Sequence, residues 1–177
     1  MEPHRFVASM RGITGFAGYS NAGKTSLIVQ LIRLDVALGL QVGVIKHTHH
    51  PNPPSQSRGD TKTFLSVGAV EVVLTGKSVG YRFDRSRPPS LFTFEHPADL
   101  PGMFGEGIDR LYVEGYKSSG QWPRVIVDRA SLSEPPVDLP ALVAAVTDRP
   151  WIFPSVPTFT HDQVEALRSF LDRMPLP

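Results

Sequence analysis

Apolar and polar positions alternate along the chain in blocks that predict strands and helices in turn. Residues 12–20 are small and apolar with a β-branched start, residues 27–38 carry Leu and Ile at helical spacing, and residues 41–48 form a β-rich run. These blocks predict a strand, a loop, a helix and a second strand, and Gly39 stands where the helix should end. The order is typical of a βαβ unit with parallel strands.

Similar blocks predict the rest of a sheet. The expected strands are 70–76, 79–84, 90–95, the "LYV" run that ends at Glu114, 124–129 and 142–148. The runs 79–84 and 90–95 are joined across "RSRPP", which suits an antiparallel hairpin at a sheet edge.

Two further helices complete the pattern. Asp60 is expected as the N-cap of a short helix, and an amphipathic helix capped at Thr160 or His161 closes the chain. Alternating strands and helices indicate a three-layer α/β fold with a mostly parallel sheet. A chain of 177 residues is long enough for one well-buried domain and too short for two ordinary ones, so we expect a single domain over residues 1–177.

The composition excludes several kinds of chemistry but says little about binding partners. The chain has no cysteine, which excludes disulfides, zinc ribbons, thiol nucleophiles and iron–sulfur ligation. Its net charge of +1 neither demands nor excludes nucleic acid, and charge or glycine interrupts its apolar runs before they could span a membrane. The N-terminus lacks the basic and apolar blocks of an export signal. We therefore expect a cytoplasmic protein without nucleic-acid or membrane partners.

One motif carries specific chemistry. The stretch "GYSNAGKT", Gly18 to Thr25, fits the Walker A pattern GxxxxGK[ST] between the first predicted strand and helix. There, backbone N–H groups surround a phosphate and the helix N-terminus points at it. Gly18 would permit the turn, Gly23 close approach of the phosphate, Lys24 a contact to its β and γ oxygens, and Thr25 a hydroxyl ligand for Mg²⁺. A glycine-rich turn before an ordinary helix is the alternative, and the context favours a P-loop NTPase-like nucleotide site.

An acidic residue at the end of a neighbouring strand should complete the Mg²⁺ site. Glu114 follows "LYV" and precedes Gly115, which places its carboxylate at a strand end. A solvent-facing Glu at a strand end would give the same pattern. Asp60 is the second candidate, and a plain N-cap role fits it as well as metal contact does.

A lysine and three histidines follow the second strand, on the carboxyl side of the sheet where ligands of such folds bind. Lys46, His47, His49 and His50 of "KHTHH" are therefore candidates for contact with phosphate, a cofactor or a partner. A transition-metal site is less favoured, because no cysteine and no clear acidic partner accompany them.

A second basic cluster lies at the tip of the expected hairpin. Arg82, Arg85 and Arg87 are either solvated, or form an anionic partner surface or the arginine lid of a small-molecule phosphotransferase. No residue in the sequence is an obvious general base for such a transfer.

Three stretches share the order and spacing of one protein family: "GYSNAGKTSL", "VGVIKHTHH" followed by "GDTKTFLSVGA", and "LYVEGYKSSGQWPRVIVDR". Together they resemble the MobB family of molybdopterin-guanine dinucleotide biosynthesis adapter proteins over nearly the whole chain. The resemblance implies a GTP- and Mg²⁺-binding adapter in molybdenum cofactor biosynthesis, a weak GTPase at most. It also implies a homodimer that contacts through the edge hairpin, and a partner in the guanylyltransferase MobA, which joins molybdopterin to GMP. Molybdopterin or its guanine dinucleotide would be a further ligand.

The resemblance also assigns residues. It places the nucleotide on Gly18, Tyr19, Ser20, Asn21, Ala22, Gly23, Lys24, Thr25 and Ser26. Thr25 and Glu114 would lie near Mg²⁺, and Lys46 to His50 beside the site. Many relatives carry Gly or Ser where this loop has Asn21 and Ala22. The guanine-reading pattern NKxD is absent, so guanine specificity rests on the resemblance, with Asp148 of "VTDRP" as a candidate for contact with the base.

Two alternatives remain open at this point: a P-loop small-molecule kinase, and a stoichiometric partner protein whose nucleotide site has no function. For the adapter, we expect contacts of Lys46 to His50 and Asp60 to couple the bound phosphate to the loop 51–59, because a nucleotide shifts a conformational equilibrium only through differential contacts.

Overall fold

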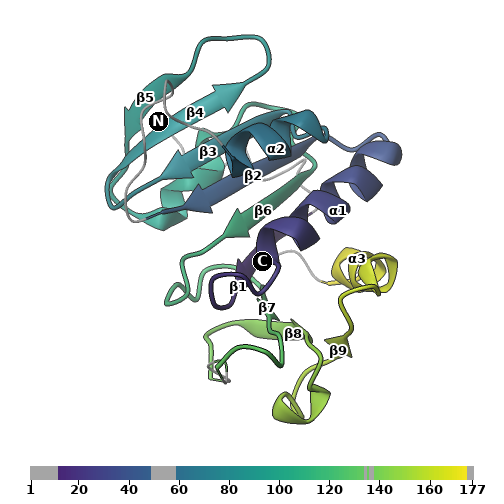
Figure 1. Ribbon diagram of the computed structural model, residues 1–177. Helices are drawn as coiled ribbons and strands as arrows, with labels where there is room; N and C mark the ends of the chain where they lie inside the picture. The colour runs from purple at the N-terminus through teal and green to yellow at the C-terminus, as the bar shows by residue number, and fades with distance from the viewer. Residues whose placement is uncertain (1–11, 49–58, 134, 136–137, 175–177) are drawn as a thin grey trace.

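The computed structural model of the chain describes residues 12–48, 59–133, 135 and 138–174 (Figure 1). Its α-helices are α1 Lys24–Ala37, α2 Asp60–Ser66 and α3 Val164–Asp172. Its strands are β1 Gly12–Ala17, β2 Val42–His47, β3 Glu71–Thr75, β4 Val79–Asp84, β5 Ser90–Thr93, β6 Arg110–Glu114, β7 Arg124–Val127, β8 Leu142–Val146 and β9 Thr158–Phe159. Two 3₁₀ segments, η3 Pro97–Met103 and η4 Pro150–Ile152, lie between strands.

The strands form one sheet in the order β5-β4-β3-β2-β6-β1-β7-β8-β9. From β3 to β9 all neighbours are parallel, whereas β4 pairs antiparallel with both β3 and β5. The prediction of a mostly parallel α/β sheet with an antiparallel edge hairpin is confirmed. The sequence did not predict β9, because a strand of two residues leaves no periodic pattern.

Helices cover one face of this sheet. Figure 1 shows α1 and α2 across the sheet, with α3 beside the end of α1. One apolar cluster joins Leu31 of α1, Phe64 of α2 and Leu167 of α3 to the strands. On the other face, Leu100 of η3 and neighbouring loop residues such as Phe104 make a second cluster with the strands. The third layer is therefore built from 3₁₀ and irregular segments, and Pro101 lies inside η3, where it removes a backbone donor.

The predicted end of α1 and the predicted N-cap of α2 each differ from the structure by one residue. α1 ends at Ala37 with Leu38 as its C-cap, one residue before the predicted Gly39. Gly39 follows the cap with a φ of 81°, and the N–H groups of Gly39 and Leu40 donate back to the carbonyls of Val36 and Asp35 at 3.0 Å each. The predicted N-cap role of Asp60 is wrong. Gly59 is the N-cap of α2, and Asp60 is the first residue inside the helix.

The predicted cap of the last helix is also wrong. α3 begins at Val164 with Gln163 as N-cap. Thr160 instead closes a turn with Gln163, whose N–H donates to the Thr160 carbonyl at 3.1 Å, while the Thr160 hydroxyl donates to Asp162 at 2.5 Å. The Thr160 side chain is thus engaged within the turn and does not cap the helix.

A buried charge network joins the helical layer to the sheet. Asp35 of α1 is fully buried and accepts hydrogen bonds from the Tyr112 hydroxyl and from Arg168 Nε at 2.7 Å. Arg110 of β6 lies 3.8 Å from the same carboxylate and also pairs with Asp172 of α3. The network fixes α1 and α3 against β6, the strand that ends at Glu114. No helix within the described residues is long and apolar enough to cross a bilayer.

Candidate nucleotide-binding site

A cavity of about 510 Å³ opens where the carboxyl ends of β1, β2 and β6 meet. Its lining residues come from the phosphate loop with the first turn of α1, from the neighbouring strands β2 and β6, and from the start of α2: Ser20, Asn21, Gly23, Lys24, Thr25, Ser26, Lys46, Asp60 and Glu114. The sequence predicted every one of these positions. The structure brings them together because parallel strands end at one edge of the sheet.

The backbone conformation of the phosphate loop explains why glycine and asparagine occupy three of its positions. Gly18 has a φ of 141°, and a Cβ there would lie 2.1 Å from the Val127 carbonyl oxygen, so only glycine fits. Gly23 has a φ of 97°. Asn21, at a φ of 65°, is in the left-handed region that Asn tolerates better than most residues. Ala22 is fully buried, and its N–H donates to the Tyr19 carbonyl at 3.3 Å.

Lys24 lies folded across the loop. Its ammonium donates to the carbonyl oxygens of Gly18 at 3.1 Å and Tyr19 at 2.7 Å. Burial lowers the pKa of Lys24, and the nearby Glu114 carboxylate opposes that shift. The lysine is therefore a partly desolvated cation, for which a phosphate would be a strong partner.

A short network of polar contacts forms the opposite wall. The Thr25 hydroxyl donates to both carboxylate oxygens of Glu114 at 3.1 Å. Lys46 donates to Glu114 Oε1 at 3.1 Å and also to Asp60. Burial would lower the pKa of Lys46, but the carboxylates of Glu114 and Asp60 outweigh it and raise that pKa above its ordinary value.

These donors fit Mg²⁺. A hydroxyl and a carboxylate are hard oxygen ligands, and Mg²⁺ usually takes one or two such groups together with phosphates and water. Thr25 and Glu114 would hold the ion, which would neutralise phosphate charge. Among the residues that the structure describes, no group of three or more His, Asp or Glu side chains is arranged to hold a metal by itself.

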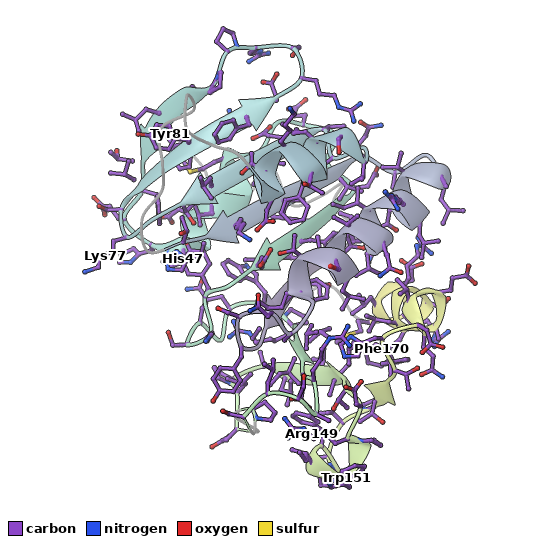
Figure 2. All side chains as sticks on the ribbon, in the orientation of Figure 1. His47, Lys77, Tyr81, Arg149, Trp151 and Phe170 are labelled. Atoms are coloured by element: carbon purple, nitrogen blue, oxygen red, sulfur yellow. The ribbon has the colours of Figure 1, made fainter. Side chains whose placement is uncertain are left out.

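The other predicted residues contribute less directly. The Tyr19 ring is 38% exposed at the start of the loop, with Lys117 Nζ 5.5 Å from its centroid. His47 stacks on Tyr116, with ring centroids 4.3 Å apart, and Figure 2 shows it at the left of the view, at the end of β2. His47 is not among the lining residues of the cavity. His49, His50 and most of the loop 51–59 lie outside the described residues.

The predicted arginine lid has no support in this arrangement. Arg82 Nε pairs with Glu71 at 2.7 Å, and Arg85 donates to the carbonyl of Leu65 in α2 at 2.5 Å. The backbone N–H of Arg87 donates to Asp84 within the hairpin turn. None of the three arginines lines the cavity, so the kinase alternative loses the feature that motivated it.

Sequence reasoning missed two residues beside the phosphate loop. A Cβ built on Gly23 would lie 3.4 Å from Arg129 Nη2 and 3.9 Å from His161 Nδ1. Arg129 follows β7 and His161 follows β9, so both lie at the edge of the sheet where the cavity opens. The signal that could have found them is strand order, which a single sequence does not contain.

Comparison with known proteins decides the family. The family model described as Molybdopterin guanine dinucleotide synthesis protein B, MobB, matches residues 13–148. This span is more than half of the chain and includes the phosphate loop, Lys46, Asp60 and Glu114. The chain belongs to the MobB family.

Two MobB relatives share the name molybdopterin-guanine dinucleotide biosynthesis adapter protein. The one from Haemophilus influenzae is 27% identical over 142 residues, which cover 80% of this chain and 76% of the relative. The one from Escherichia coli K12 is 24% identical over 166 residues, which cover 92% of this chain and 93% of the relative.

Solved MobB structures share the fold. The crystal structure of a MobB homologue from Bacillus stearothermophilus has a TM-score of 0.52 at 20% identity and covers 93% of this chain and 100% of that chain. Bacillus subtilis MobB has a TM-score of 0.54 at 21% identity and covers 92% of this chain and 99% of that chain. These structures show that the chain has the fold of MobB proteins, which is consistent with the expected P-loop NTPase-like fold.

Proposed function

We propose that this MobB protein is a GTP-binding adapter in the biosynthesis of molybdopterin guanine dinucleotide, and that it assists the guanylyltransferase MobA. The observation that carries the proposal is the contact of Thr25 with both oxygens of Glu114, beside a phosphate loop whose left-handed residues are already in place. Strand β1, helix α1 and strand β6 thus hold a nucleotide cradle and its metal ligands in one rigid frame. The names of the relatives from H. influenzae and E. coli support the pathway.

Within this cradle each side chain has a distinct task. Lys24 would leave the carbonyls of Gly18 and Tyr19 and turn to the β and γ oxygens. Mg²⁺, when bound, would supply positive charge that offsets the charge of the phosphates. Thr25 and Glu114 would hold the ion, and the backbone of the phosphate loop would orient the phosphates.

We propose that hydrolysis is slow. The carboxylates that line the cavity within the described residues are Asp60 and Glu114, and both accept a hydrogen bond from Lys46. A carboxylate whose oxygen already accepts from an ammonium is poorly placed to take a proton from an attacking water. GTP would then act as a ligand that sets a conformation, as an adapter requires.

We propose that the Lys46–Asp60 ion pair couples the bound nucleotide to the position of helix α2 at the surface. Lys46 ends β2 in the cavity and pairs with Asp60, the first residue of α2. Phosphates and Mg²⁺ would compete for both partners of this pair, so the position of α2 would depend on the bound nucleotide. This is the element that a partner such as MobA could read.

We also propose a homodimer that forms through the hairpin β4–β5. Strand β5 is the last strand at one edge of the sheet, and its Leu91 side chain is 62% exposed. An edge strand with an exposed apolar residue is a ready surface for pairing with a second copy.

A competition titration tests the nucleotide assignment. The purified protein would be titrated with labelled GTP against unlabelled GTP or ATP in the presence of Mg²⁺, and then mixed with the guanylyltransferase from the same organism with and without GTP. Preference for GTP and association with the enzyme are expected. Equal or tighter binding of ATP, or no association under any nucleotide condition, would overturn the proposal.

A further inference from the structure

The sheet carries a second set of polar side chains on the side of the phosphate loop away from the Mg²⁺ ligands. Glu114 and Lys46 end β6 and β2, which lie on one side of β1. Arg129, Asp148 and His161 follow β7, β8 and β9, which lie on the other side. All these strands are parallel, so both sets reach the same edge of the sheet. A nucleotide seated on the loop has its metal on one side and must place its base elsewhere.

His161 connects this second set to the loop. Its Nε2 lies 2.8 Å from the carbonyl oxygen of Asp128, and since a carbonyl only accepts, Nε2 carries the proton. Its Nδ1 is the atom that faces Gly23. On the Nε2 side the ring lies 3.6 Å from Asp148 Oδ1. The imidazole therefore stands between the phosphate loop and the Asp148 carboxylate.

The frame behind Asp148 is rigid. Asp128 is 2% exposed and pairs with Arg149 through Nη2 at 2.7 Å and Nε at 3.0 Å. Figure 2 shows Arg149 beyond β8, well apart from His47. The Asp148 side chain is 43% exposed, and its Oδ2 accepts from the backbone N–H of Ala130 at 3.2 Å. Asp148 is thus a carboxylate fixed by its neighbours with one oxygen turned toward His161 and solvent.

An ionised carboxylate accepts hydrogen bonds and donates none. Guanine presents an N1–H and a 2-amino group side by side on one edge, whereas adenine presents an acceptor nitrogen and a C–H at the corresponding positions. A single carboxylate can therefore pair with guanine through two hydrogen bonds and cannot pair with adenine in this way. This chain lacks NKxD, and Asp148 is a carboxylate, held in place by Ala130, that could make this pair of hydrogen bonds with guanine.

We propose that Asp148 reads the guanine base, with the Arg129 guanidinium against the ring or the adjacent phosphate and His161 holding the loop and the carboxylate in register. This inference rests on the proposed function, because it names the specificity-determining residue of the same GTP site. Arg129 and His161 are positioning residues and do not discriminate between bases.

Base analogues test the assignment. The unmodified chain and Asp148→Asn would be titrated with GTP, ATP, inosine triphosphate and xanthosine triphosphate in Mg²⁺. The unmodified chain should bind GTP roughly ten- to a hundredfold more tightly than ATP, and inosine triphosphate, which lacks the 2-amino group, more weakly than GTP. Asp148→Asn should lose a similar factor for GTP and gain affinity for xanthosine triphosphate, because an amide N–H matches the carbonyl that replaces the 2-amino group.

Two further variants distinguish recognition of the base from a purely structural role of the residues around it. Arg129→Ala should weaken all four nucleotides by a similar factor. Glu106→Gln, which removes an exposed carboxylate before the amino end of β6, should leave all four affinities unchanged. If Asp148 only holds Ala130, then Asp148→Asn will change all nucleotides alike.

The outcomes distinguish the inference from the proposed function. GTP preference in the unmodified chain with no gain for xanthosine triphosphate in a folded Asp148→Asn overturns the inference and leaves the GTP site standing. Equal affinity of the unmodified chain for GTP and inosine triphosphate also overturns the inference, even if the variant fails to fold. No preference for GTP over ATP overturns both.

Discussion

Lys46 and Glu114 face each other across β2 and β6, as partners in the parallel register and with Nζ 3.1 Å from Oε1. Glu114 is 7% exposed and also accepts the Thr25 hydroxyl, so one carboxylate joins the centre of the sheet to the phosphate loop. The pair places a cation beside the proposed Mg²⁺ ligands Thr25 and Glu114. The binding properties of the site should therefore depend on both lysines that line it, and on the carboxylates that hold Lys46.

Lys24→Ala should weaken GTP binding by roughly 30- to 150-fold, because it removes a charge-assisted phosphate contact worth about 2 to 3 kcal/mol. Titration with labelled GTP in Mg²⁺ measures the change. Arg33→Ala, an exposed position on the same helix, is the matched control and should bind like the parent. A loss of only a few-fold would mean that the backbone of the loop supplies most of the phosphate affinity.

Glu114→Gln should reduce the gain in GTP affinity that Mg²⁺ brings by roughly tenfold, because the amide carries no charge toward the ion. Binding measured in a chelator should stay the same or become tighter, since a negative charge near the phosphates is gone. The measurement is a GTP titration across a series of Mg²⁺ concentrations. An unaltered Mg²⁺ dependence would remove Glu114 from the metal site.

The two walls of the site differ in how far the sequence could predict them. Thr25 lies next to Lys24 in a contiguous motif, so its place in the wall of the cavity follows from local spacing. Glu114 was found because it ends an apolar run. Its contact with Lys46 depends on β2 and β6 being neighbours, and adjacency of strands far apart in sequence is set by packing of the whole sheet.

Local competition explains the boundaries that were wrong. Asp60 looked like an N-cap because Asp favours that position, but Lys46 draws its side chain into the cavity and Gly59 takes the cap. Thr160 looked like a cap for α3, but its hydroxyl bonds to Asp162. In both cases the side chain bonds to a polar partner instead of capping the helix, and helix propensity does not take such partners into account.

GTP with Mg²⁺ should change hydrogen exchange across residues 46–62, with the largest effect in the first turn of α2, because the nucleotide and the ion compete for the partners in the Lys46–Asp60 pair. Asp60→Asn should make the difference smaller. Exchange measured by mass spectrometry with and without nucleotide gives the answer. Identical exchange in this segment would rule out α2 as the link to a partner.

Asp35→Asn should lower the free energy of unfolding by about 3 kcal/mol, because the amide removes the fully buried charge that Tyr112, Arg168 and Arg110 surround. The two arginines then keep Asp172, which is 36% exposed, as a charge partner. Urea unfolding at neutral pH measures the loss. The exposed Arg33→Ala should stay within about 0.5 kcal/mol of the parent. A loss equal to that of the control would show that the network is replaceable.

Asp128 gives the fold a defined acid sensitivity. Burial would raise its pKa, but hydrogen bonds from Arg149 and Thr147 outweigh burial and hold the pKa below its ordinary value of 3.8. A carboxyl with a lowered pKa in the folded state contributes its full stability above pH 3.8 and loses it as the pH falls through the lowered pKa.

Asp128→Asn should therefore cost about 3 kcal/mol of unfolding free energy at pH 7, because it removes one partner of a buried ion pair. The difference from the parent should shrink as the pH falls below 3.8, and it should vanish once the pH passes the lowered folded-state pKa and the parent carboxylate is neutral as well. Urea unfolding of both chains at pH 7, 4 and 3 checks this, with the tryptophan signal as readout. A difference that is the same at all three pH values would mean that packing, and not the charge of Asp128, stabilises the region around Asp128 and Arg149.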